Sequence, residues 1–150
     1  MLFRSIFSFL SEEQLNLVKQ SSGKTGERGK EFTKKLREAG IIVEWEKAEA
    51  IFQNLTWPKF TRLAEKAFPG LQDLHPDVYG AIVSLVFNRG TSLKGDSRKE
   101  MANIKLLIAK KDYKGIAKQL KDMKRLWIGK GLDGLLERRD AEAALVSSAA

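Results

Sequence analysis

The segment from Gly80 to Gly90 constrains the fold more than any other part of the chain. It reads Gly-Ala-Ile-Val-Ser-Leu-Val-Phe-Asn-Arg-Gly and is apolar on nearly every face until its last three residues. A helix that is apolar all round belongs inside a protein, and Pro76 suits its first turn, where a missing N–H costs nothing. We therefore expect a buried central helix at about residues 76–89, with Asn88 held at the wall of a cleft.

Helical signals continue on both sides of this segment. Ser11 followed by Gln14 fits a capping box, apolar residues recur at helical spacing in most of the chain, and no convincing period-2 strand pattern is present. The length of 150 residues is enough for one domain with a sizeable core. We predict an all-α fold with an N-terminal extension at 1–10, a single helical domain at 11–146 and a disordered tail at 147–150.

The net charge of +8 is carried mostly by the C-terminal part of the chain. Residues 1–90 hold 13 basic and 11 acidic side chains, whereas residues 91–150 hold 14 basic and 8 acidic ones. Such a basic region attracts polyanions, which include nucleic acid, anionic lipid and the acidic polymers of a bacterial wall. Charge alone does not choose among these partners.

The residue types exclude several kinds of site. The chain has no cysteine, which rules out disulfides and thiolate metal sites. Its one histidine, His75, precedes Pro76 and is expected to be a turn residue just outside the central helix, with a general-base role as the alternative. One histidine and scattered acids do not make a metal site. We therefore expect neither a metal nor a cofactor.

The opening stretch Met1 to Leu10 is apolar but about half as long as a membrane span, and no small-residue cleavage site follows it. We therefore expect no signal peptide and no membrane span, and a protein that stays cytoplasmic until it is released or exported by another route. A packed or frayed extension is the favoured interpretation of this stretch, and a short interfacial anchor is the alternative.

Four separated motifs carry a family resemblance. They are the segment 80–90 above, Lys-Asp-Tyr-Lys-Gly-Ile-Ala at 111–117, Lys-Arg-Leu-Trp at 124–127 and Gly-Leu-Leu-Glu-Arg-Arg-Asp-Ala-Glu-Ala-Ala-Leu at 134–145. In this order they resemble the C-terminal lobe of phage-type lysozymes, the muramidases of glycoside hydrolase family twenty-four. The resemblance implies a lysozyme-like helical domain of phage origin, an endolysin that breaks down peptidoglycan by hydrolysing the β-1,4 link between its amino sugars without a cofactor.

The resemblance also implies three substrate-binding residues. Asn88 matches an amide that lines the sugar cleft and approaches the tryptophan matching Trp127, and Arg138 matches an arginine that reaches toward an acidic N-terminal helix. An amide has donors and an acceptor for sugar hydroxyls, and an indole face packs on a pyranose. The alternatives are a helix-end residue for Asn88, core packing for Trp127, and a solvated face paired with Glu142 for Arg138 and its neighbour Arg139.

The N-terminal part departs from the family pattern. Phage-type lysozymes carry a catalytic glutamate on a first helix, followed by a glycine-rich hairpin with an acidic residue and a threonine. Glu12 and Glu13 imitate this spacing loosely, but residues 21–26 contain no carboxylate and are typical of a helix–helix connector. Both glutamates are therefore candidate acids, although helix-start carboxylates are the favoured interpretation. We predict a muramidase-family protein of cell-wall breakdown whose acid-bearing segment is truncated or replaced, and whether it is an enzyme stays open.

A basic helical protein that binds nucleic acid or anionic envelope polymers is the alternative function. No recognition-helix motif or aromatic RNA platform accompanies the basic residues, so a solvated face is the favoured interpretation of them. The side chains that would form this surface are Lys105, Lys110, Lys111, Lys114, Lys118, Lys121, Lys124 and Arg125.

Overall fold

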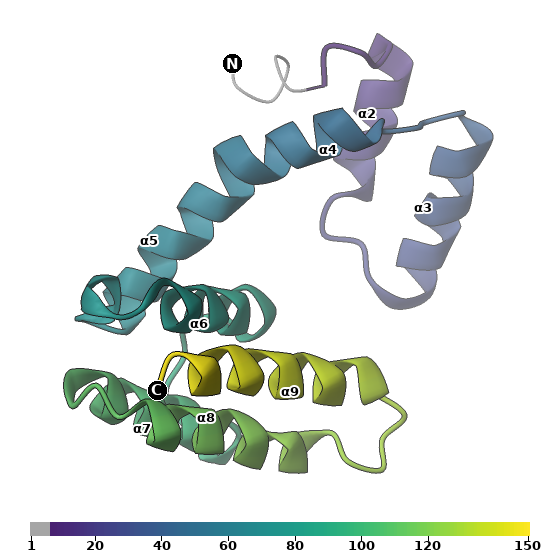
Figure 1. Ribbon diagram of the computed structural model, residues 1–150. Helices are drawn as coiled ribbons and strands as arrows, with labels where there is room; N and C mark the ends of the chain where they lie inside the picture. The colour runs from purple at the N-terminus through teal and green to yellow at the C-terminus, as the bar shows by residue number, and fades with distance from the viewer. Residues whose placement is uncertain (1–6) are drawn as a thin grey trace. The chain divides into compact units, whose positions relative to one another are not determined.

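A computed structural model describes residues 7–150, and within that range every regular element is a helix (Figure 1). The predicted all-α fold class is therefore confirmed. Most of the predicted extension 1–10 lies outside the described residues. The chain separates into two compact units, Met1–Leu55 and Thr56–Ala150, which are called unit 1 and unit 2 below.

Unit 1 contains α2 (Glu12–Ser21), α3 (Gly26–Glu38) and α4 (Trp45–Ile51). A π-helix, η1 (Phe52–Thr56), follows across the boundary of the units. The residues between α2 and α3 form a short connection, which confirms the predicted helix–helix connector and leaves no hairpin in this part of the described chain.

The predicted capping box begins α2. Ser11 Oγ accepts a hydrogen bond from the Gln14 backbone N–H at 3.1 Å, and Gln14 Oε1 accepts one from the Ser11 N–H at 3.1 Å. Both bonds satisfy N–H groups that the first turn leaves without a helical partner. Leu15, one residue further on, is buried.

Unit 2 holds the main hydrophobic core, because its helices carry apolar stripes that face one another. Its elements are α5 (Trp57–Ala67), η2 (Leu71–Asp73), α6 (Pro76–Arg89), η3 (Asp96–Arg98), α7 (Lys99–Ala109), α8 (Tyr113–Asp122), η4 (Met123–Leu126) and α9 (Asp133–Ser148).

Helix α6 is the buried central helix that the sequence predicts, with the same bounds. It packs against α5 and α9, and α9 in turn packs against α8 (Figure 1). The helix ends at Gly90, whose φ of +73° lies in the left-handed region that favours glycine. Its buried side chains are Val78, Ala81, Ile82, Val83, Leu85 and Val86. Because α6 is buried between Val78 and Val86, its last residues, Phe87 to Arg89, emerge from a packed part of unit 2.

Residues 11–146, predicted as a single domain, span both compact units, and the predicted domain limits stay a prediction. Helices α3 and α4 bury no side chain, and the core cluster begins at Ala64. Helix α9 also continues through Ser148, into the predicted tail 147–150, because Val146 and Ala149 pack on the core.

Candidate functional site

The end of α6 places two polar side chains at the surface of unit 2. Asn88 is exposed, while Arg89 is half-buried with its guanidinium carbon 4.9 Å from the centroid of the Trp127 ring. Arg89 Nη2 donates a hydrogen bond of 2.6 Å to the Ser97 carbonyl. Burial, together with the positive charge of Arg98, lowers the pKa of Arg89 to about 10. The structure therefore places the Arg89 guanidinium over the indole, and the predicted approach of Asn88 to Trp127 stays a prediction.

Trp127 is 9% exposed and belongs to the hydrophobic core cluster of unit 2. The Arg139 guanidinium carbon is 5.9 Å from its ring centroid, so the indole has two cationic neighbours, Arg89 and Arg139. A cation over an indole face is attracted by the ring quadrupole. The core position agrees with the packing alternative for Trp127, and its contact with sugar stays a prediction.

Arg139 and Glu142, both on α9, form a buried ion pair on the side of the helix that contacts α6. Arg139 and Glu142 are 0% and 3% exposed, and Arg139 Nη2 is 2.7 Å from Glu142 Oε1. The same oxygen accepts a hydrogen bond from Ser84 Oγ at 2.6 Å. Burial raises the pKa of Glu142 and lowers the pKa of Arg139, because desolvation disfavours both charged forms.

The alternative interpretation of Arg139 in the sequence analysis was a solvated face paired with Glu142. The pairing is present, but the prediction that Arg139 faces solvent was wrong. The run Glu-Arg-Arg-Asp-Ala-Glu has the composition of an exposed helix face, which hides the burial. A signal was nevertheless present, because Arg139 lies four and seven residues before Ala143 and Val146 and thus on the apolar stripe of α9. Helical position, rather than residue type, identifies this arginine as a core residue.

A groove of about 460 Å³ runs between α6 and α9. Arg138 is half-buried at this groove, with Nη1 3.5 Å from Ser84 Oγ. Glu142 also lines it, and Glu142 Oε2 has no hydrogen-bond partner among the described residues. The full lining is Gly80, Ala81, Ser84, Gly134, Glu137, Arg138, Ala141, Glu142 and Leu145.

The two candidate acids occupy the first turn of α2 in unit 1. Glu12 and Glu13 are both exposed, and carboxylates are favoured at this end of a helix. Glu13 also lines an open hollow of about 450 Å³, where it is the one carboxylate in the lining. Glycoside hydrolysis needs a proton donor together with a second carboxylate or a positioned water. A catalytic role for Glu12 or Glu13 stays a prediction.

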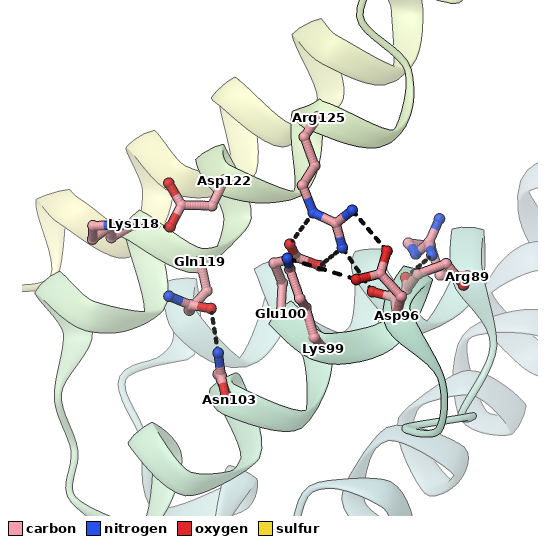
Figure 2. Close-up of polar contacts among 10 residues, drawn as sticks. Arg89, Asp96, Lys99, Glu100, Asn103, Lys118, Gln119, Asp122 and Arg125 are labelled. Carbon is pink, nitrogen blue, oxygen red and sulfur yellow. Dashed lines mark hydrogen bonds and ion pairs between the residues drawn. The ribbon is translucent and has the colours of Figure 1, made fainter.

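A second polar cluster joins side chains of η3, α7 and η4 (Figure 2). Arg125 Nε donates to Glu100 Oε1 at 2.6 Å, and Glu100 is only 2% exposed. Arg125 Nη1 donates to Asp96 Oδ2 at 3.0 Å, and Nη2 donates to the Asp96 carbonyl at 2.7 Å. These bonds raise the pKa of Arg125 and lower the pKa of Asp96. Sequence reasoning placed Arg125 only among the exposed basic residues and missed this cluster.

Three basic residues of the nucleic-acid alternative already pair with acidic side chains. Lys118 pairs with Asp122 at 2.6 Å and Lys124 pairs with Asp140 at 2.6 Å, while Arg125 is held as described above. The other members of the predicted surface are exposed lysines: Lys105, Lys110, Lys111, Lys114 and Lys121. The ion pairs agree with a solvated face, and binding of nucleic acid by it stays a prediction.

His75 is the N-cap residue of α6, which confirms the predicted turn position. Its Nδ1 accepts a hydrogen bond from the Asp77 N–H at 3.2 Å. Among residues 7–150, no three His, Asp or Glu side chains are grouped so that they could hold a metal ion. Within the same range, no helix is both long and apolar enough to cross a membrane.

Comparison with known proteins gives one finding. A family model described as phage lysozyme matches residues 18–142, which is most of the chain. No curated protein and no solved structure gives a significant match.

Proposed function

The chain belongs to the phage lysozyme family, and from this we propose that the end of α6 and the groove between α6 and α9 bind peptidoglycan. Membership of the family assigns the chain a muramidase-like function in cell-wall breakdown, with peptidoglycan as the substrate. The observation that carries the proposal is that the groove is lined by α6 and α9, which contain two of the four motif segments, 80–90 and 134–145.

The proposed substrate-binding residues are Asn88, Trp127 and Arg138. The exposed amide of Asn88 has donors and an acceptor for sugar hydroxyl and acetamido groups. Arg138 contributes guanidinium donors at the groove, and Trp127 supports the end of α6 through the contact of its ring with Arg89. The buried side chains of α6 anchor the helix that carries Asn88, which favours binding because less conformational freedom is lost.

We also propose that α2, its connector and α3 replace the acid-bearing segment of the family. The connector Ser22-Gly23-Lys24-Thr25 contains no carboxylate, and α3 begins directly after it. Hydrolysis of the β-1,4 link requires two carboxylates, or one and a positioned water, about 5–10 Å apart across the sugar. The hollow beside α2 has one carboxylate, Glu13, in its lining. This supports the proposal that the chain binds the wall and that neither Glu12 nor Glu13 is a catalytic acid.

Wall binding tests the first proposal. We expect the purified full-length chain to sediment with insoluble peptidoglycan, and Asn88→Ala and Arg138→Ala to weaken this binding by about threefold to tenfold each, the size expected for one lost hydrogen bond. Asn103→Ala on α7 and Lys105→Ala are matched controls for the amide and the charge, and neither should change the affinity. Equal affinity of all five proteins would sink the proposed site.

Zymography in a gel containing peptidoglycan tests the replaced segment. We expect Glu12→Gln and Glu13→Gln to give the same clearing as the parent chain, whether that clearing is strong or absent, because neither carboxylate is the proposed proton donor. Circular dichroism of each variant should show the parent helix content. Clearing by the parent chain that disappears in either variant contradicts the proposal and identifies the catalytic acid.

A further inference from the structure

A closed series of contacts joins the end of α6 to η3 and η4, all within unit 2. Arg125 on η4 binds Asp96 on η3, and Ser97 follows Asp96 in the chain. The Ser97 carbonyl accepts from Arg89 on α6 at 2.6 Å. The Arg89 guanidinium lies over Trp127, two residues after Arg125. These five residues are called the Arg125 ring below, and Figure 2 shows the part that contains Arg125, Asp96 and Arg89.

Arg125 is the member of the ring that holds two segments at once. Its Nε and Nη2 face the buried Glu100 carboxylate at 2.6 and 3.4 Å, which fixes the plane of the guanidinium. Its Nη1 and Nη2 then reach both the side chain and the carbonyl of Asp96. A lysine has the same charge but lacks this planar fork of donors. The position of η3 therefore depends on the shape of the Arg125 side chain as well as on its charge.

The orientation of the Arg89 side chain depends on the position of η3. Its Nε is buried and has no hydrogen-bond partner among the described residues, and its guanidinium contacts the Ser97 carbonyl and the Trp127 ring. The backbone between α6 and η3 contains Gly90 and Gly95, both with positive φ, and glycine allows many backbone conformations. Loss of the contact between Arg125 and Asp96 leaves η3 held by its continuity with α7 and by the exposed ion pair of Lys99 with Asp96, so the Ser97 carbonyl that Arg89 uses is less restrained.

We propose that Arg125 is a positioning residue, which sets the orientation of Arg89 and the adjacent Asn88 and thereby the affinity of the chain for the wall. Arg125 acts through Asp96 and Ser97 rather than by touching substrate. The inference rests on the proposed function, because Asn88 is the group through which it reaches the wall.

The test compares Arg125→Lys with Lys118→Met in the full-length chain. Lys118→Met removes an exposed ion pair from the same face but touches no member of the ring. Three quantities are measured: the ¹H–¹⁵N resonance of Arg89 Nε, which the ring current of Trp127 shifts, the melting temperature, and the affinity for insoluble peptidoglycan. The affinities of Asn88→Ala and of the double variant Arg125→Lys/Asn88→Ala complete a double-mutant cycle.

We expect Arg125→Lys to move the Arg89 resonance and to weaken wall binding by about threefold to tenfold, no more than Asn88→Ala does, a coupling of the size seen between residues of one network. Lys118→Met should do neither. In the Asn88→Ala background the effect of Arg125→Lys on affinity should largely vanish, which a loss of general stability does not produce.

Two results overturn the positioning role. One is an unchanged Arg89 resonance in Arg125→Lys, and the other is a loss of affinity that adds fully to that of Asn88→Ala or follows the melting temperature. If the parent chain does not bind peptidoglycan, the proposed function fails and the role of Arg125 in binding fails with it. A moved Arg89 resonance in that case shows that the ring is real and that the error lies in the proposed function.

Discussion

Arg139→Met is expected to lower the free energy of unfolding by about 3–5 kcal/mol, because it leaves the Glu142 carboxylate buried without its partner charge. Glu142 is 3% exposed, and its Oε2 has no hydrogen-bond partner among the described residues, so no described donor on this oxygen compensates for the loss of Arg139. Ser84 donates to the other oxygen only. Urea unfolding at pH 7 measures the loss. Arg138→Met, on the same helix and half-buried, is the matched control and should lose less than about 1 kcal/mol.

A second substitution separates the cost of an unpaired charge from the value of the pair. Replacing both partners, as Arg139→Met/Glu142→Leu, should restore most of the stability, since a buried ion pair gains little over apolar side chains of similar volume. Met123 Sδ is 3.9 Å from Arg139 Nη1, so the site already has apolar surroundings for a methionine. A double variant less stable than Arg139→Met alone would show that the pair contributes more than its burial costs.

Acidification should reduce the loss caused by Arg139→Met. Burial holds the pKa of Glu142 above its ordinary value of 4.5. A carboxyl with a raised pKa in the folded state stabilises the fold below its unfolded pKa, and this contribution disappears as the pH rises through the folded pKa. Without Arg139 the folded pKa rises further, so the stability gap between variant and parent should shrink as the pH falls from 7 toward 4.5. A gap independent of pH would contradict this account of Glu142.

Leu85→Ala in the middle of α6 is expected to cost about 2–5 kcal/mol of unfolding free energy, because it removes a packed side chain and leaves a cavity. Leu85 is 0% exposed and belongs to the core cluster of unit 2. Leu106→Ala on α7 makes the same chemical change at a position that is 65% exposed, and it should stay within about 0.5 kcal/mol of the parent. Denaturant titrations of both variants give the comparison, and similar losses would contradict a core built around α6.

Helix positions and ends could be predicted from the sequence where local chemistry decides them. The apolar run from Gly80 to Gly90 predicted α6 with its observed bounds, and Ser11 with Gln14 predicted the capping box. Both depend on residues within one or two turns, so the signal is present in any short window. The division of residues 11–146 into two units could not be predicted in this way, because it depends on which helices bury side chains against distant ones.

The candidate site was less accessible to sequence reasoning because its contacts join distant segments. Arg125 meets Asp96 across 29 positions, and Ser84 meets Glu142 across 58. The sequence predicted Asn88 beside Trp127 and gave no indication that the neighbouring Arg89 lies over the indole ring, as it does in the structure. Side chains of successive residues on an α-helix point about 100° apart. Which side chain contacts Trp127 therefore depends on how α6 is packed.

The sequence by itself determined the helical class, the central helix, the capping box of α2 and the family, because each of these depends on residue type at local spacing. Only the tertiary structure decided that Arg139 is buried, that Arg125 holds η3, and that the groove beside Arg138 lies between α6 and α9. The physical reason is that burial and long-range ion pairing depend on which surfaces meet. The local sequence around a charged side chain does not show whether that side chain faces the core or the solvent.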